Sequence, residues 1–185
     1  WHAAGRVGQL RTSINMTQLA RYTSQLYRGL EEDTGQATGY RQCGSISIAA
    51  TAERFEELKR SASMAKVFGL EVNVLSVADI AEKYPLIQTD DLYGGIHIPS
   101  DGYANAVDIT QALAKGAKSR GAQIFTDTKV EAILRDGDQV TGVRTAEGEI
   151  RSKYGVICGG MGSRDLAAAV GVNLPRHACG HYYGV

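Results

Sequence analysis

The segment Gly155-Val156-Ile157-Cys158-Gly159-Gly160 bears most directly on the fold. Its first four residues predict a short, buried, apolar strand, and a glycine pair follows at once. Residues 164–170 then predict a helix. A strand, a glycine pair and a helix in this order give a backbone that a phosphate or ribose can approach closely. A glycine pair after a strand is, however, more often a plain turn, so both interpretations stay open.

The rest of the chain alternates long helices with short strands. Apolar spacing predicts further helices over residues 16–32, 51–68, 76–83 and 107–120. Alternation and turn residues predict two strands within residues 39–50, and single strands over 91–99, 122–125, 130–134, 139–145 and 149–151. This order predicts a mixed α/β or α+β fold. Few of these strands could flank residues 155–158 on both sides, so we expect sequence outside this chain to complete one sheet.

Single residues predict where some elements begin or bend. Asn15 is expected to cap the first long helix, and Ser76 a short one, with Asp79 near the positive end of its dipole. Gly94-Gly95 predicts a bulge or a close backbone approach within a strand. Gly116 lies inside a predicted helix, where close packing against a neighbour is the expected reason for a glycine.

Composition excludes several classes of protein. The 185 residues are 43% hydrophobic and 22% charged, as in ordinary globular proteins. Twenty basic and twenty acidic side chains cancel, so we expect no nucleic-acid or membrane partner. Cys43, Cys158 and Cys179 are too widely spaced for a disulfide framework or a metal site, which favours a reducing compartment. The sequence opens on Trp1 without an initiator Met, which suggests a cut or processed end.

A series of short motifs runs in order along almost the whole chain. They are Trp1-His2-Ala3-Ala4-Gly5, Leu30-Glu31-Glu32-Asp33-Thr34-Gly35, Gly44-Ser45-Ile46, Tyr84-Pro85-Leu86, Asp91-Leu92-Tyr93-Gly94-Gly95, Asp101-Gly102, Gln111 to Ala117, Gly121-Ala122 and His177-Ala178-Cys179 with His181 and Tyr183. In this order they resemble the flavin-dependent dimethylglycine and sarcosine dehydrogenases, within the wider fold group that includes D-amino-acid oxidase. A run of ordered motifs is more specific than any one of them.

The resemblance implies a domain organisation. The chain would be part of an FAD-binding Rossmann-like domain with an inserted substrate domain of mixed or antiparallel sheet. Residues 1–37 and 101–170 would belong to the FAD-binding domain, and residues 38–100 and 171–185 to the substrate-binding domain. Both domains would be incomplete, because the Gly-x-Gly-x-x-Gly fingerprint for the FAD pyrophosphate is absent and lies upstream of the Trp-His motif in the family.

His2 is the residue that the resemblance marks for covalent attachment of FAD, through a ring nitrogen joined to the 8α carbon of the flavin. A neutral imidazole is a competent nucleophile near neutral pH, and a covalent bond prevents loss of the cofactor. The alternative is a solvent-exposed histidine at a chain end.

His181 and Tyr183 are the catalytic residues that the resemblance implies. The histidine would lie beside the flavin and orient the amine or influence its protonation, because oxidation of a C–N bond needs the amine lone pair free. Tyr183 is two residues on, and therefore on the same face if the segment is a strand. The alternative makes His177 and His181 polar residues of a surface strand.

Val130, Gly159 and Gly160 are the remaining cofactor-binding candidates. Val130 matches the position whose backbone contacts the adenine in related flavoproteins, and Gly159-Gly160 matches a step close to the nucleotide. The alternatives are a core valine and a plain turn. Three other residues depart from the family pattern and bear on flavin packing and activity: Arg6 replaces an apolar residue, Gly162 a tryptophan, and Gly180 an acidic or apolar residue.

The implied function is FAD-dependent oxidative demethylation of an N-methylated glycine, of the dimethylglycine or sarcosine type, in the intact enzyme. The partner would be a small amine substrate, and folate would bind only through a C-terminal module missing here. The compartment would be the cytoplasm or the mitochondrial matrix. Alternatives are a non-catalytic relative with the same fold, or an oxidase of another small amine, a polyamine or a D-amino acid.

Overall fold

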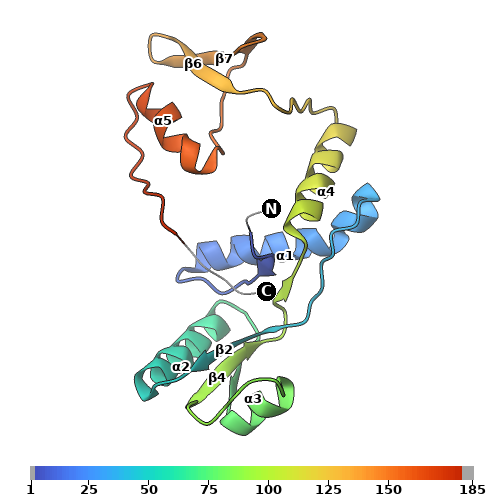
Figure 1. Ribbon diagram of the computed structural model, residues 1–185, viewed down its shortest axis with the longest axis vertical. Coiled ribbons are helices and arrows are strands. Elements are labelled where there is room, and N and C mark those ends of the chain that lie inside the picture. The colour runs from blue at the N-terminus through green and yellow to red at the C-terminus, as the bar shows by residue number, and fades with distance from the viewer. Residues whose placement is uncertain (1–2, 181–185) are drawn as a thin grey trace. The chain divides into compact units, whose positions relative to one another are not determined.

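Short antiparallel sheets and α-helices make up residues 3–180, the part of the chain that the structure, a computed structural model, describes (Figure 1). The helices are α1 (Ile14–Thr34), α2 (Ala52–Val67), α3 (Val77–Lys83), α4 (Ala106–Ser119) and α5 (Ser163–Ala168), with a 3₁₀ turn η1 (Gly160–Gly162) before α5. The strands are β1 (Arg6–Val7), β2 (Ser45–Ala49), β3 (Asn73–Leu75), β4 (Gly94–Ile98), β5 (Gly102–Tyr103), β6 (Val130–Asp136), β7 (Gln139–Thr145) and β8 (Gly148–Arg151).

The chain divides into a first unit, Trp1–Ala122, and a second unit, Gln123–Val185. Helices and short strands intermix in both, which confirms the predicted mixed α/β class. The four-part domain assignment made from the resemblance stays a prediction.

A three-stranded sheet of order β2-β4-β3 carries the main core of the first unit. Helix α2 packs on the face of β4 that bears Ile96 and Ile98, and Leu58, Ala62 and Ala65 of the helix are buried there. Figure 1 shows α2 lying along β2 and β4. This apolar side of α2 is the one that the sequence spacing predicts.

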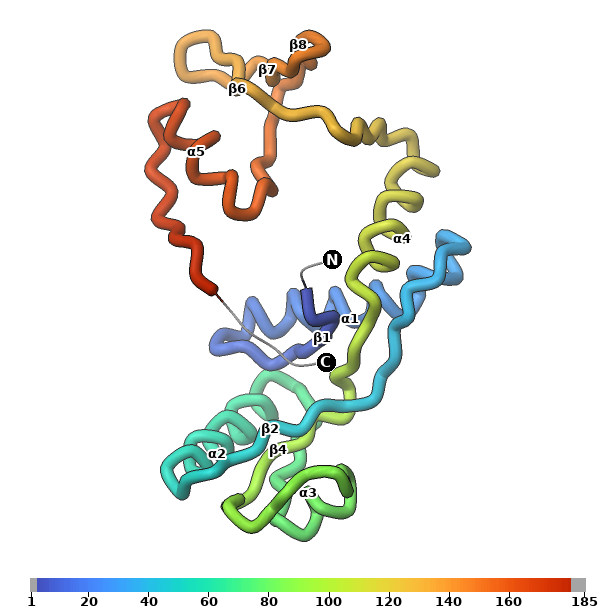
Figure 2. Tube along the Cα trace, viewed as in Figure 1, coloured from blue at the N-terminus to red at the C-terminus, as the bar shows by residue number. Residues whose placement is uncertain are grey.

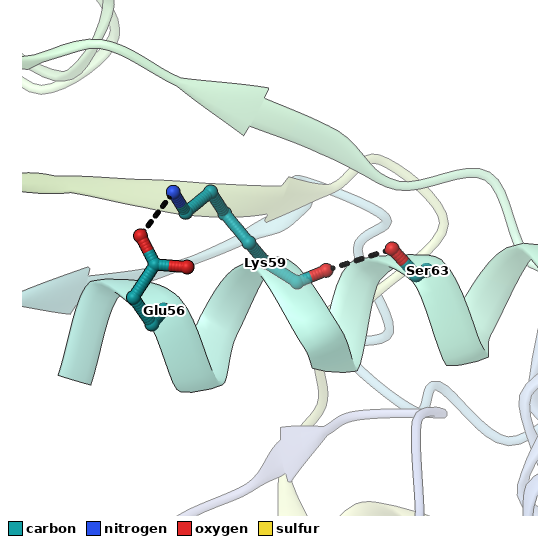
Figure 3. A network of polar contacts seen from close by, with 3 residues as sticks. All are labelled: Glu56, Lys59 and Ser63. Atoms are coloured by element: carbon teal, nitrogen blue, oxygen red, sulfur yellow. Dashed lines mark hydrogen bonds and ion pairs between the residues drawn. The ribbon is translucent and has the colours of Figure 1, made fainter. Parts of the chain in front are cut away.

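The other side of α2 is polar. Lys59 pairs with Glu56 one turn earlier, and the Lys59 carbonyl accepts a hydrogen bond of 3.1 Å from the Ser63 hydroxyl (Figure 3). Arg54 pairs with Glu57 at 2.6 Å on the same helix. Exposed pairs of this kind contribute little stability, so α2 is held chiefly by its buried side.

The glycine pair in β4 allows the close approach that the sequence predicts. A Cβ atom at Gly95 would lie 2.6 Å from the backbone oxygen of Ser47 and 3.2 Å from Ile80 of α3. Gly94 has a left-handed φ of 145°, and a Cβ atom there would lie 2.5 Å from the Phe55 ring. Because successive strand residues face opposite sides, α2 and α3 cover the two faces of the sheet at this pair.

Helices α1 and α4 pack against each other, which accounts for Gly116. A Cβ atom at Gly116 would lie 3.2 Å from Cγ2 of Thr34. The Lys115 ammonium donates a hydrogen bond of 3.2 Å to the carbonyl of Gly35, which ends α1 with a φ of 62°. A larger residue than glycine at 116 would press on the last turn of α1.

A buried carboxylate ties the start of the chain to this unit. Strand β1 pairs with β5, about a hundred residues later. Asp101, 2% exposed, accepts hydrogen bonds from the Gln9 backbone N–H (2.9 Å) and the Ser45 hydroxyl (2.6 Å). Buried carboxylates persist where such donors satisfy them, so Asp101 fixes the segment that follows β1.

The second unit is built on a meander of order β6-β7-β8, followed by η1 and α5 (Figure 2). Asp136 pairs with Gln139 at the β6–β7 turn, where Gly137 has a φ of 56°. This is the hairpin that the Asp136-Gly137 pair predicts.

Two predicted strands are wrong. Residues 155–158 form no strand, and Val156 is 87% exposed. Residues 122–125 are likewise irregular and exposed. The physical reason is the same for both: no strand among residues 3–180 runs beside them, so their backbone groups have no ladder to join.

Two predictions within the first unit are also wrong. Residues 39–50 form one strand, β2, because residues before it reach only an isolated bridge between Arg41 and Tyr103. Ser13 replaces Asn15 as the cap of α1: it has extended backbone, and its hydroxyl accepts from the Met16 N–H. The remaining predicted helices and strands are confirmed, with ends shifted by a few residues.

Candidate functional site

Three of the six predicted site residues lie in the described part of the chain, all in the second unit. Val130 begins β6, and Gly159 and Gly160 lead into the 3₁₀ turn before α5. His2, His181 and Tyr183 lie outside the described residues. Their predicted roles are therefore not tested by the geometry.

An apolar cavity of about 410 Å³ brings Val130 and Gly159 together. Its walls come from the inner face of β6 and β7, the irregular segment before η1, and the residues in and after α5. They include Ile133, Val140, Val143, Val156, Ile157, Leu166, Val170 and Val172. The volume lies in the range of small-molecule sites, and the lining suits a flat, largely apolar group.

The glycine step, Gly159-Gly160, has free space around Gly160 and a neighbouring side chain beside Gly159. Gly160 has a left-handed φ of 54°, and nothing lies within 4 Å of the position that its Cβ atom would occupy. A Cβ atom at Gly159 would lie 3.5 Å from the Ser163 hydroxyl. A ligand could therefore approach the backbone of Gly160 more closely than that of any L-residue with a side chain.

Ser163 carries a buried polar atom with no partner among the described residues. The residue is 1% exposed, and its hydroxyl makes no hydrogen bond there. Buried hydroxyls are nearly always satisfied, so an unpaired one beside a glycine step indicates a missing partner. A serine at the start of a helix is ordinarily a cap, so the sequence pattern alone does not mark Ser163 as a binding residue.

These three features fit the cofactor that the resemblance implies. The cavity offers an apolar wall for an adenine ring at Val130, the glycine step offers backbone close by, and Ser163 offers an unused hydroxyl. The residues that would hold the adenosine end of FAD are therefore Val130, Gly159 and Gly160, with Ser163 beside them. That assignment stays a prediction.

The three residues that depart from the family pattern, Arg6, Gly162 and Gly180, lie where the described structure is not tightly packed. Gly162 has nothing within 4 Å of its Cβ position, so the structure leaves room for the larger residue expected there. Arg6 in β1 and Gly180 are both exposed. None of these three residues disturbs the packing of the described core.

Comparison with known proteins decides the family. The pattern described as "DAO: FAD dependent oxidoreductase" matches residues 1–185. The chain belongs to the FAD-dependent oxidoreductase family. This confirms the resemblance found in the sequence.

Relatives within the FAD-dependent oxidoreductase family cover essentially the whole chain at similar identity. Human mitochondrial sarcosine dehydrogenase is 37% identical over 191 residues, which is 100% of this chain and 21% of that protein. A 4-methylaminobutanoate oxidase (formaldehyde-forming) of Paenarthrobacter nicotinovorans is 37% identical over 99% of this chain and 22% of its own length. The mouse mitochondrial pyruvate dehydrogenase phosphatase regulatory subunit is 37% identical over 97% of this chain and 21% of its length. The chain thus spans about a fifth of each relative.

Solved structures of the family share this fold. Glycine oxidase from Geobacillus kaustophilus aligns with a TM-score of 0.80 and 31% identity, over 93% of this chain and 48% of that chain. The chain therefore corresponds to less than half of a complete flavoprotein of this type.

No three His, Cys, Asp or Glu side chains among residues 3–180 are grouped closely enough to hold a metal ion. Among the same residues, no helix has the length and apolar character needed to cross a bilayer. Cys43, Cys158 and Cys179 are free and exposed.

Proposed function

We propose that the intact protein oxidises an N-methylated glycine, of the dimethylglycine or sarcosine type, with FAD. The observation that supports FAD binding by this chain is the cavity lined by both Val130 and Gly159. The unpaired Ser163 hydroxyl lies beside it. Relatives named as a sarcosine dehydrogenase and a methylaminobutanoate oxidase support an N-methylamine substrate.

FAD supplies the two-electron acceptor for the substrate C–N bond, and hydrolysis of the oxidised amine, or transfer of its one-carbon unit to folate, completes demethylation. The chain's own part at the nucleotide end is to bind and orient. Val130 and the glycine step would hold the adenosine, and the apolar walls would exclude water from it. We assign covalent attachment through a ring nitrogen to His2.

His181 and Tyr183 are proposed to act at the substrate. Only a neutral amine has a free lone pair, so a base beside it raises the reactive fraction. A histidine titrates near neutrality and suits that task, with its proton held on a ring nitrogen. Tyr183 would orient the same amine by a hydrogen bond from its hydroxyl.

The test uses the full-length protein that contains this chain. We expect yellow flavin absorbance that stays with the protein after acid precipitation, and that is released by acid from a His2→Ala variant. Adding dimethylglycine or sarcosine should bleach the flavin and release formaldehyde. Bleaching by D-amino acids with release of ammonia, and none by N-methylated glycines, would contradict the proposed substrate.

A second candidate function has its own support. The relative named as a regulatory subunit of pyruvate dehydrogenase phosphatase is as similar as the enzymes are. The changes proposed to affect the flavin at Gly162 and Gly180 agree with a non-catalytic role. A full-length protein that holds flavin yet is not bleached by any small amine would favour this alternative.

Compartment, partners and further modules belong to the same proposal. We infer the mitochondrial matrix or the cytoplasm, since the human sarcosine dehydrogenase and the mouse regulatory subunit are both named as mitochondrial. The proposed partner is the small amine itself. Folate would bind through a part of the protein outside this chain.

A further inference from the structure

Residues 5–9 are held against residues 101–104 by backbone contacts. Strand β1 pairs with β5 there. At the start of this pairing, the Ala104 N–H donates a hydrogen bond of 2.8 Å to the Gly5 carbonyl. Gly5 has a left-handed φ of 76°, and a Cβ atom at this residue would overlap the Ala104 oxygen, so the two backbones are in close contact. These contacts begin three residues after His2.

Asp101 joins this segment to a third one. Its carboxylate Oδ1 accepts hydrogen bonds from the Gln9 backbone N–H at 2.9 Å and from the Gln9 side-chain amide at 3.3 Å. Its Oδ2 accepts from the Ser45 hydroxyl at 2.6 Å, and its backbone carbonyl accepts from the Gly44 N–H at 2.8 Å. One residue therefore connects the start of the chain to the segment that leads into β2.

The burial of Asp101 makes these hydrogen bonds costly to break. The residue is 2% exposed, and no lysine or arginine among residues 3–180 forms an ion pair with it. A buried carboxylate that loses a donor is left partly unsatisfied, which costs more free energy than the loss of an exposed hydrogen bond. Residues 5–9 therefore leave this position less readily than a two-residue strand alone would.

The fixed position of Gly5 limits where the chain before it can reach. His2 precedes Gly5 by three residues, and three residues of fully extended chain span no more than about 11 Å. The attachment proposed above joins a ring nitrogen of His2 to the 8α carbon of bound FAD. Two groups held close together in one molecule react much faster than groups that move freely. A fixed Gly5 should therefore speed attachment.

We propose that Asp101 is a positioning residue for attachment of the flavin to His2. By holding residues 5–9, it raises the fraction of time in which the imidazole lies within bonding reach of the 8α carbon. This inference rests on the covalent attachment proposed above. In that reaction a C–N bond replaces one C–H bond of the 8α methyl group and the N–H bond of the imidazole. The two protons and two electrons released pass to dioxygen, which is reduced to hydrogen peroxide.

The test measures covalent attachment separately from flavin binding. Full-length protein, produced without flavin under riboflavin starvation, is mixed with FAD in air, and the flavin that stays with the acid-precipitated protein is followed over time. Asp101→Ala should slow attachment by about tenfold or more, because residues 5–9 lose both hydrogen bonds to the carboxylate. Total flavin before precipitation should change much less, since no proposed adenosine contact is altered.

Asp101→Asn is the conservative variant and should restore most of the attachment rate. Its amide oxygen can still accept from the Gln9 N–H, and its amide nitrogen can donate to the Ser45 hydroxyl. Gln9→Ala is the second variant if Asp101→Ala does not fold. It removes side-chain hydrogen bonds to Ser100 and Asp101, and should slow attachment by about threefold.

Ser24→Ala is the matched control for loss of stability alone. Ser24 is 1% exposed, and its hydroxyl forms a hydrogen bond of 3.0 Å with the Tyr40 hydroxyl and none with residues 5–9. This variant should have a lower thermal midpoint and the wild-type attachment rate. All rates are measured at a temperature below the thermal midpoint of every variant.

The possible outcomes separate this role from the proposed function. Asp101→Ala protein, or Gln9→Ala protein in its place, that gains covalent flavin at the wild-type rate would overturn the role of Asp101. Equal slowing by Ser24→Ala would also overturn it. Wild type that binds FAD but holds none after acid would reject attachment through His2, and the role of Asp101 with it. Bleaching by sarcosine needs only bound flavin, so it tests the proposed oxidation independently.

Discussion

Backbone atoms of β2 occupy the space that a side chain at Gly95 would need. Its Cβ position lies 2.6 Å from the Ser47 oxygen, closer than real Cβ contacts. We expect Gly95→Ala to destabilise the protein by about 1–3 kcal/mol, because β2 and β4 must move apart. Urea unfolding, monitored by circular dichroism, measures this loss of stability.

Gly29 provides the opposite substitution for comparison. It lies inside α1 with nothing within 4 Å of its Cβ position. Gly29→Ala should therefore stabilise the protein by about 0.5–1 kcal/mol, through helix propensity alone. Equal effects of the two substitutions would show that backbone crowding at Gly95 is not what limits that position.

His97 predicts a pH dependence. Burial lowers its pKa, nearby Lys83 lowers it further, and Glu71 and Asp101 act in the opposite direction. The folded protein then binds fewer protons at this site than the unfolded chain, whose histidine titrates near pH 6.5. This contribution to stability is present above that pH and is lost as pH falls through the lowered pKa.

The thermal midpoint of the wild type should therefore drop more than that of His97→Gln when pH is lowered from about 7.5 to about 5.5. Equal drops in the two proteins would assign the acid sensitivity to other groups. The imidazole lies against Gly44, so a glutamine of similar reach is the least disturbing replacement.

At the residue scale, sequence predicted part of the candidate site. Val130 and Gly159 are distant in sequence, yet the structure places both on one cavity. Ser163 was not predictable, because the burial of a single hydroxyl depends on three-dimensional packing.

At the level of elements, α3 depends on its first turn. The Ser76 hydroxyl accepts from the Asp79 N–H (3.2 Å), and the Asp79 carboxylate accepts from the Ser76 N–H (2.8 Å). Ser76→Ala should cost about 1 kcal/mol, since an N–H at the helix start loses its partner. Chemical denaturation would measure the loss.

Ser63 on α2 is a suitable control for that prediction. Its hydroxyl only donates to Lys59 of the preceding turn, on the exposed face drawn in Figure 3. Ser63→Ala should change stability by less than about 0.5 kcal/mol. A similar loss in both variants would show that removal of any serine hydroxyl, and not the cap, lowers stability.

Elements were predictable where their signal is local. Ser76 with Asp79 specifies a helix start from four consecutive residues, and the apolar spacing of α2 identifies its buried side. The strand predicted at residues 155–158 needed neighbours that no local pattern supplies. Apolar, β-branched composition shows that a segment can be buried, but pairing requires another strand beside it.

At the scale of the whole molecule, the link between the two units is the expected point of cleavage. Residues 123–127 are exposed and belong to no helix or strand, and Lys129 just after them is exposed as well. Limited digestion with trypsin should cut first after Lys129, leaving the helices of the first unit intact. Mass spectrometry identifies the cut.

Lys129→Gln should slow that first cut, because trypsin needs a basic residue, and cleavage after the other lysine and arginine residues should not change. First cleavage within α2 or the β6–β7 hairpin would contradict the division into two units. The same digestion on the flavin-loaded protein should release fragments of which only one carries flavin absorbance, if His2 is the point of attachment.

The pairing of β1 with β5 fixes when, during synthesis of the protein, β1 can first find its partner strand. Arg6 and Val7 acquire their partners only when Tyr103 and Gly102 have left the ribosomal exit tunnel. At about 5–20 residues per second, the nascent amino-terminal segment waits roughly 5–20 s without its strand partner. During that interval Arg6 and Val7 have no partner strand, so the segment that contains β1 can take its folded position only after β5 has been synthesised.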